Sequence, residues 1–203
     1  MAKRYEQVVR FSVDLRGVEP TVRRRFEVPA EMTLADLHRV LQVTFQWDDD
    51  HLHSFRVGDK RYGPPQVRGG GLGPPVLPEE GIKVGTLARQ GHQRLLYEYD
   101  FGDGWLHDIR VLQVRDADPE RPAPALLHAQ GRTPPEDCGG PHGYADLLAI
   151  LDDPTHPDHA EYTEWYPDGI DPHAPETEAI EKMLPALRQG WRPRGRRARS
   201  GRA

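Results

Sequence analysis

Three short segments of the chain gather the residue types that do chemistry in proteins. They read WDDDHLHSF at 47–55, YDFGDGWLH at 99–107 and PPEDCGGPHGY at 134–144. The first two combine carboxylates with imidazoles, and the third adds a thiol to both. Such groups transfer protons and bind metal ions. We therefore expect these segments to build the functional site.

A site for a divalent metal ion is one chemistry that the segments allow. Imidazole and carboxylate together suit zinc, manganese or iron. His51 and His53 are two residues apart, so on a strand both imidazoles would lie on one face. A third ligand from Asp100 or His107 would complete an open site that activates water, and zinc or manganese is the expected ion. The predicted ligands are His51, His53, Asp100 and His107, and the predicted catalytic groups are Glu136, as base, and Asp137.

Structural roles compete for the same residues. His53 could donate a hydrogen bond to a buried carbonyl, and Asp100 with His107 could form a cross-strand ion pair. The acids at 48–50 could end one element and begin a turn. Asp103 stands in an Asp-Gly pair, which a tight turn favours for its backbone alone. The spacing therefore permits a metal site without requiring it.

The third segment and the aromatic residues also have two explanations. Glu136 and Asp137 could accept hydrogen bonds from backbone N–H groups of their own loop instead of acting in catalysis. Trp47, Trp105 and Tyr144 could be edges of the core or could stack on a ligand. The residues that we predict for ligand binding are Trp47, Asp49, Asp103, Trp105 and Tyr144.

Other catalytic signatures are weak in this sequence. The glycines of GGGLG at 69–73 are not followed by Lys-Ser or Lys-Thr, so they do not form a phosphate-binding P-loop. The sequence has no G-x-S-x-G motif, and Cys138 has only the nearby His142 as a candidate partner. Glu136 and Asp137 are adjacent, and adjacent side chains rarely face each other across a glycoside.

The pattern of apolar residues predicts the elements that hold the three segments. Alternation over 5–16, resumed over 22–28, predicts an amphipathic strand pair. Helical spacing over 34–45 predicts a helix. Thr33 and Asp36 resemble a capping box at its start, although Asp replaces the usual Glu or Gln.

Strands are also expected in the middle of the chain. The segment 51–57 alternates like a strand, and proline and glycine over 63–81 predict a long surface loop or a flap. The clearest pattern is a β-hairpin around Asp103-Gly104, a pair suited to a two-residue turn. With that turn Asp100 would lie opposite His107, whereas a three-residue turn with a bulge would change the register.

The last third of the chain is expected to be helical. After Val114 the sequence predicts another irregular loop that ends in 134–144. Helices follow at about 144–153, 158–166 and 176–187. Strands and helices do not alternate as they do in βαβ units. The predicted fold class is therefore α+β, with a largely antiparallel β-sheet, a long β-hairpin, one helix after the first strand pair and a helical C-terminal part.

Composition limits the class of protein. The chain has 203 residues, 36% hydrophobic and 29% charged, with a mean hydropathy of −0.74, which predicts one domain with a thin core and long connections. The single cysteine excludes an internal disulfide and fits a reducing compartment. The N-terminal residues lack the apolar stretch of a signal peptide, and no window has the length and apolarity of a membrane span. We expect a soluble, cytoplasmic protein.

Charge is distributed unevenly along the chain. Residues 188–203 contain seven arginines and no acid, so a chain of formal charge −5 carries −12 in residues 1–187. We predict one domain over 1–187 and an Arg-rich, disordered tail over 188–203. The tail could contact nucleic acid or an acidic protein weakly, whereas the acidic body would repel phosphate backbones. It could equally be a solubilising tail, or could bind the acidic body itself.

The three segments, in this order, together with SVDLRGVEPTVRRRFEVP at 12–29 and the helix after it, resemble the plasmid pRiA4b ORF-3-like family. The resemblance covers about residues 5–187. It implies an α+β bacterial domain found on plasmids and as a passenger of insertion elements, where some members carry a TnpR label. No recombinase motif supports resolvase activity in this chain. Many members read ACPPED where this chain reads RTPPED, so Thr133 replaces a cysteine and a thiolate site is disfavoured.

Two functions of different class are consistent with these residues. An acidic domain with long loops, a basic tail and no catalytic signature favours a binding or interaction module that acts through the three segments. The alternative is a metal-dependent hydrolase, for which the mobile-element setting favours a phosphodiester substrate. A third explanation, polar packing between hairpin and loop, needs no ligand.

Overall fold

An eight-stranded sheet forms the centre of the molecule, whose structure is a computed structural model that describes residues 3–67 and 75–193. Each neighbouring pair in the sheet is antiparallel except β5 with β6. In spatial order its strands are β6 (Val76–Pro78), β5 (Lys60–Gly63), β4 (His53–Val57), β7 (Arg94–Tyr99), β8 (Trp105–Asp116), β2 (Gln7–Leu15), β3 (Arg23–Pro29) and β9 (Ala125–Gln130).

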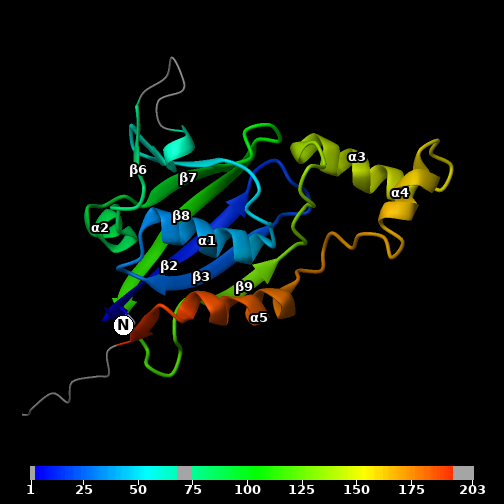
Figure 1. Cartoon of the computed structure of the whole chain (residues 1–203). Helices are drawn as coiled ribbons and strands as arrows, with labels where there is room; N and C mark the ends of the chain where they lie inside the picture. Colours follow the sequence, from blue (N-terminus) through cyan, green and yellow to red (C-terminus); the bar gives the residue numbers. More distant parts are fainter. Residues whose placement is uncertain (1–2, 68–74, 194–203) are drawn as a thin grey trace, which may run out of the picture.

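Helices cover one face of this sheet and extend beyond one end of it. Figure 1 shows α1 lying across the sheet, α5 below it beside β9, and α3 and α4 reaching away from the sheet. The predicted α+β class is therefore confirmed. The described helices are α1 (Leu34–Phe45), α2 (Val84–Arg89), α3 (Gly140–Asp152), α4 (His159–Trp165) and α5 (Thr177–Arg188), with a short 3-10 turn at Pro65–Val67.

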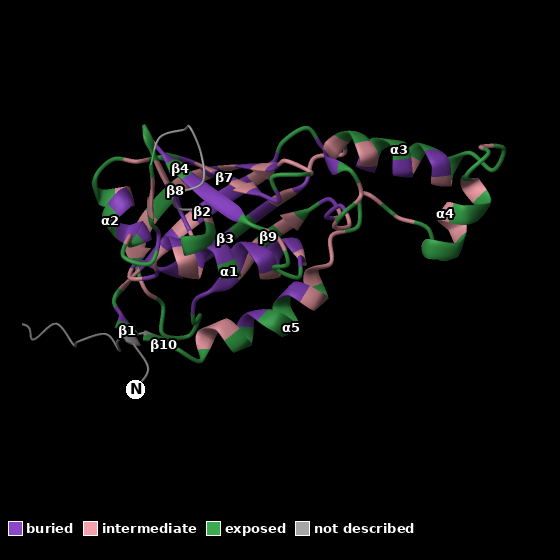
Figure 2. Cartoon of the chain, turned by 45° about the horizontal axis from the view of Figure 1, so that its top comes forward, coloured by how far each residue is buried: buried purple, intermediate pink, exposed green. Residues whose placement is uncertain are grey.

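The predicted strand pair forms because its alternation matches a sheet with one buried face. Val9, Phe11 and Val13 on β2 are almost completely buried. They pair with β8 on one side and with β3 on the other. Alternate side chains point to opposite faces of a strand, so the polar residues between them point away from the core. Figure 2 shows the resulting buried positions along the central strands and on α1.

The predicted helix is α1, with the bounds expected from its spacing. The Thr33 hydroxyl accepts from the Asp36 backbone N–H, and the Asp36 carboxylate accepts from the Thr33 backbone N–H, so the capping box is complete. Gln46 ends the helix in the left-handed conformation, with φ of 55°. The chain therefore turns sharply into the first of the three polar segments.

The hairpin register differs from the one derived for a two-residue turn. Tyr97, not Asp100, lies opposite His107, and Tyr99 lies opposite Trp105. The connection is longer because Asp100 leaves the strand with φ of 52° and its carbonyl accepts from the Gly104 N–H at 2.7 Å. Of the two registers that the sequence left open, the one from a two-residue turn, with Asp100 opposite His107, is therefore not formed.

Two predicted loops contain regular structure. β9 forms within the proline- and alanine-rich stretch after Val114, because β3 offers it a free edge. Within 134–144, α3 already begins at Gly140, since proline is tolerated in the first turn of a helix. The short strands β5 and β6 and the 3-10 turn lie within or at the edge of the predicted loop over 63–81, of which residues 68–74 are outside the described residues.

The beginning of the predicted tail is structured. α5 continues to Arg188, and Trp191–Pro193 (β10) pairs in parallel with Lys3–Tyr5 (β1). Trp191 is only 6% exposed and belongs to the core. This apolar contact stabilises the stretch, whereas the prediction of disorder rests on its high arginine content. Residues 194–203, the rest of the predicted tail, lie outside the described residues. No helix within the described residues is long and apolar enough to cross a membrane.

Gly140→Ala tests how tightly the third segment is packed on the hairpin. Gly140 has φ of 70°, and a Cβ there would overlap the carbonyl oxygen of Asp103. The substitution should lower the free energy of unfolding by at least about 2 kcal/mol, measured by urea denaturation. Gly169→Ala is the control, because Gly169 has φ of 66° and open space around it, and should cost only about 1 kcal/mol. Equal losses in the two variants would contradict the close packing.

Candidate functional site

The three polar segments meet at one end of the sheet. The Trp47 indole donates to the Pro134 carbonyl at 3.1 Å, which joins the first segment to the third. Asp103, in the hairpin turn, accepts from the Gly139 backbone N–H at 3.1 Å, which joins the second to the third. We call this surface, built from 46–52, 99–105 and 134–140, the polar edge. Residues far apart in sequence therefore share one environment.

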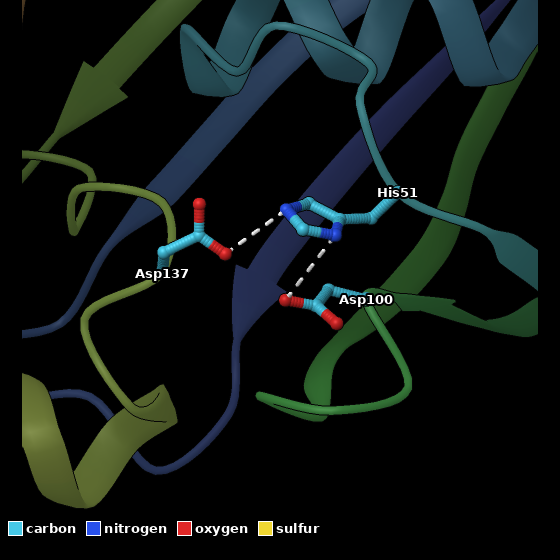
Figure 3. Close-up of side chains that lie close together, drawn as sticks. All are labelled: His51, Asp100 and Asp137. Carbon is cyan, nitrogen blue, oxygen red and sulfur yellow. Dashed lines mark ion pairs between the residues drawn. The ribbon is translucent and has the colours of Figure 1, made fainter.

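His51, Asp100 and Asp137 form a cluster on the polar edge, and Figure 3 shows the imidazole between the two carboxylates. His51 Nε2 lies 3.2 Å from Asp137 Oδ1, and His51 Nδ1 lies 3.8 Å from Asp100 Oδ2. One ligand atom from each residue lies within 4.8 Å of the others. The side chain of Asp137 is 76% exposed, whereas that of Asp100 is 12% exposed. One imidazole and two carboxylates are a donor set suited to zinc or manganese.

Both acids of the cluster sit on unusual backbone. Asp100 has φ of 52° and Asp137 has φ of 56°, in the left-handed region that costs an L-residue about 1–2 kcal/mol. Asp100 Oδ1 accepts from the Gly102 backbone N–H at 2.9 Å, which fixes the carboxylate and leaves Oδ2 toward His51. The turn that brings Asp100 to the imidazole is therefore held by a local hydrogen bond.

Glu136, the predicted base, is engaged on both oxygens. It accepts from the Tyr99 hydroxyl at 2.5 Å and from the Asp48 backbone N–H at 2.8 Å. Burial of the Tyr99 phenol and its bond to Glu136 raise the pKa of Tyr99 well above its usual range. A carboxylate used in this way holds the loop against the sheet, and its oxygens are not free to take a proton from water.

His53 and His107, the other two predicted ligands, lie apart from the cluster. His53 begins β4 and its Nε2 lies 3.0 Å from a carboxylate oxygen of Glu79. His107 is completely buried, and its Nδ1 lies 3.2 Å from the Trp105 carbonyl. His51 precedes the strand, so it does not share a strand face with His53. The four predicted ligands therefore do not form one set; His51 and Asp100 come together, and Asp137 joins them.

A buried polar network behind the polar edge was missed by sequence reasoning. His38 on α1 has Nδ1 2.8 Å from the Tyr97 hydroxyl and Nε2 2.6 Å from Asp49 Oδ1. Gln42 donates to the same hydroxyl at 3.1 Å, and the His38 ring stacks on His53 with centroids 3.6 Å apart. A signal was present in the sequence, because His38 and Gln42 stand beside Leu37 and Leu41 in the apolar stripe of the helix.

This network belongs to the core. Burial, with His53 nearby, lowers the pKa of His38 to about 4, so its imidazole is neutral at pH 7. Tyr97 is completely buried. The chain of hydrogen bonds from Asp49 through His38 therefore ends at a hydroxyl that solvent does not reach. The predicted binding residue Asp49 is thereby tied to a structural partner.

The other predicted binding side chains are also engaged or buried. Trp47, Trp105 and Tyr144 are at most 5% exposed, so they form a wall of the core and do not present faces to a ligand. Asp103 holds the N–H of Gly139. The wall also includes Tyr99, whose ring stacks on Trp47 at 5.0 Å between centroids.

The thiol of Cys138, which follows Asp137, is half-buried, and among the described residues no cationic group that would stabilise a thiolate contributes to the shift of its pKa. Burial, with Asp103 nearby, raises the pKa of Cys138 to about 11. A thiolate nucleophile needs the opposite shift.

The chain matches proteins of known sequence and structure along most of its length. The model of the family "Plasmid pRiA4b ORF-3-like protein" matches residues 7–179. Over 191 residues, 94% of this chain and 97% of the relative, the chain is 37% identical to the uncharacterized protein y4hQ of Sinorhizobium fredii. A crystal structure of MM3350, a protein of unknown function from Methanosarcina mazei Go1, has a TM-score of 0.75 and 28% identity, over 85% of this chain and 98% of that chain. Neither relative carries a stated activity.

The pH dependence of stability tests the buried imidazoles. Burial lowers the pKa of His107 to about 3, against about 6.5 in the unfolded chain. Stability from this neutral imidazole is therefore complete above pH 6.5 and is lost as pH falls toward 3. Between pH 7 and 5, His107→Phe should remove about 2 kcal/mol of the decline in the free energy of unfolding seen in the unmodified chain.

The same substitution at His173, which is exposed, is the control and should leave the decline unchanged. An unaltered decline in His107→Phe would show that His107 does not stay neutral in the folded chain.

Proposed function

This chain belongs to the plasmid pRiA4b ORF-3-like family, and from its geometry we propose that it is a binding module that holds a divalent metal ion on the polar edge. The ligands are His51, Asp100 and Asp137, with zinc or manganese as the ion. The convergence of three ligand atoms from three separate segments, all within 4.8 Å, carries this proposal.

The donor set supports binding of an ion with open coordination positions. A bound ion would replace the ion pairs that His51 makes with the two acids and would link the 134–140 loop to the hairpin turn. Three protein ligands leave positions for water or for an oxygen of a partner. The exposure of Asp137 puts those positions on the solvent side of the edge.

The neighbours of the cluster favour binding over catalysis. Glu136 uses both carboxylate oxygens to hold the loop. Cys138 has a raised pKa, and the imidazole of His107 is enclosed in the core. These three groups near the cluster, which could take or give a proton, are thus held in structural roles. A hydrolase needs a side chain that is free to transfer a proton, whereas a binding surface does not.

A metal-dependent hydrolase acting on phosphodiesters is the second candidate. The exposure of Asp137 favours it, because a three-ligand ion that is open to solvent can activate water. In that case His51, Asp100 and Asp137 would hold the ion, and water bound to the ion would be the nucleophile.

Titration of the purified chain with Mn²⁺ or Zn²⁺ alone, followed by calorimetry, tests the metal site. We expect one ion per chain, and at least tenfold weaker affinity in Asp137→Asn, because an amide oxygen carries no charge. Asp100→Asn should weaken binding similarly while keeping the acceptor for the Gly102 N–H. Asp50→Asn is the matched control, an exposed acid outside the cluster, and should change affinity less than twofold. No binding, or equal losses in all three variants, would overturn the site.

Hydrolysis of bis(p-nitrophenyl) phosphate by the Mn²⁺-loaded chain separates the two candidates. For a binding module we expect no rate above that of Mn²⁺ in buffer. Turnover that is lost in Asp137→Asn and kept in Asp50→Asn would replace the binding module with the hydrolase.

A further inference from the structure

The face of the sheet turned away from α1 is crowded with arginine side chains. Positions that are paired across antiparallel strands share a face, so the strand registers define which residues point there. We call this surface the arginine face. Its arginines on strands are Arg10, Arg23, Arg25, Arg56, Arg61, Arg94, Arg110 and Arg115, and Arg16 reaches it from the end of β2. Its acids are Asp14, Glu27, Glu98 and Asp108.

Arginines oppose each other directly in two places on this face. Arg94 pairs with Arg110 between β7 and β8, and Arg56 pairs with Arg61 between β4 and β5. Like charges at directly opposed positions of a sheet destabilise it. One arginine of each pair already has an acid as partner, since Arg110 contacts Asp14 at 2.7 Å and Arg61 contacts Glu98 at 3.5 Å. A bound anion would relieve the repulsion that remains at the other arginine of each pair.

The acids on the arginine face hold several arginines in place by ion pairs, but they are too few to balance the charge of all of them. Glu27 accepts from Arg10 at 3.0 Å and from Arg115 at 2.9 Å. Although burial alone would raise the pKa of Glu27, the two arginines outweigh it and hold the pKa below its usual value. One carboxylate is thus shared by two guanidinium groups, and one positive charge is left over.

A second shared carboxylate repeats this arrangement. Asp14 accepts from Arg23 at 2.5 Å and from Arg110 at 2.7 Å. The Arg110 side chain is still 43% exposed, although its Nε is buried, so the exposed part of its guanidinium can reach a ligand. Fixed guanidinium groups lose less conformational entropy when they bind.

Three arginines of the face are exposed and have no ion pair within the described residues: Arg25, Arg56 and Arg94. They stand on β3, β4 and β7, so they are spread over much of the sheet. The whole chain nevertheless has a formal charge of −5. A basic face on an acidic molecule would orient the molecule toward a polyanion.

We propose that the arginine face binds the phosphate backbone of duplex DNA without reading its sequence. Guanidinium groups bind phosphate oxygens in pairs of hydrogen bonds. No tryptophan, tyrosine or phenylalanine occupies the paired strand positions of this face. Phe101, an exposed ring beside the face, already lies against the Arg61 guanidinium, whose carbon is 5.3 Å from the ring centroid. These strands therefore offer no row of free rings of the kind on which proteins stack single strands. A duplex presents its phosphates outward and needs no such platform. This interaction is independent of the metal ion on the polar edge.

Fluorescence anisotropy of a labelled duplex of mixed sequence, titrated with the full chain at two salt concentrations, tests the proposal. In the triple variant Arg25→Glu, Arg56→Glu, Arg94→Glu the affinity should fall at least tenfold. The slope of log affinity against log salt should become shallower by about 2 to 3, since about three phosphate contacts are lost. These side chains are exposed, so circular dichroism should be unchanged.

The matched control is the triple variant Arg39→Glu, Arg89→Glu, Arg121→Glu, which changes the net charge equally at exposed positions outside the face. It should lose less than threefold, which separates the face from net charge and from the Arg-rich tail present in both variants. EDTA should leave duplex binding unchanged, so a failed metal site would not affect this result.

Three results would overturn the proposal. Equal losses in the two triple variants would assign binding to net charge or to the tail. Tighter binding of a single strand of equal length than of the duplex would exclude the duplex as ligand. Self-association that is lost in the face variant while duplex binding is unchanged would make the face a contact between copies of this chain.

Discussion

Coverage of the sheet on one face only is the constraint from which the rest of the structure follows. α1 lies against that face, so each central strand alternates between residues that pack toward the helix and residues that point away from it. The second set includes the exposed arginines and also buried residues such as Ser12 and Glu27. On β2 this separates Val9 and Phe11, which are buried, from Arg10 and Asp14, which are not. A slip of one residue in register would exchange the two sets. The same alternation therefore builds the core and exposes the arginine face.

The end of the sheet shows how a small core accommodates many polar groups. His38 and Gln42 satisfy the Tyr97 hydroxyl inside the protein, and His107 lies edge-on to the Trp47 ring. Buried polar groups are stabilised by hydrogen bonds, so the bonds to the Tyr97 hydroxyl fix α1 against β7. Glu136 extends this role to the surface by holding its loop. His53 and His107, which were predicted as metal ligands, are thus core residues. The cluster of His51, Asp100 and Asp137 forms at the polar edge, outside the core.

Two surfaces of opposite character result from this arrangement. The polar edge gathers carboxylates around one imidazole, and the arginine face gathers guanidinium groups around shared carboxylates. The ligands that we propose for them differ accordingly, because carboxylates attract a divalent cation and guanidinium groups attract a polyanion. The acidic composition of the chain hides this division, since net charge averages over surfaces that face different directions.

The sequence by itself determined the elements whose pattern is local. The capping box of Thr33 with Asp36, the periodicity of α1 and the alternation of β2 are all set by near neighbours, and the structure confirms them. The polar segments that build the candidate site were also visible in the sequence. Only the tertiary structure decided which of their side chains meet: His51 joins Asp100 and Asp137, whereas His107 enters the core. Residue spacing cannot decide this, because a left-handed residue at Asp100 changes the turn length, and pairing across strands depends on contacts between distant parts of the chain.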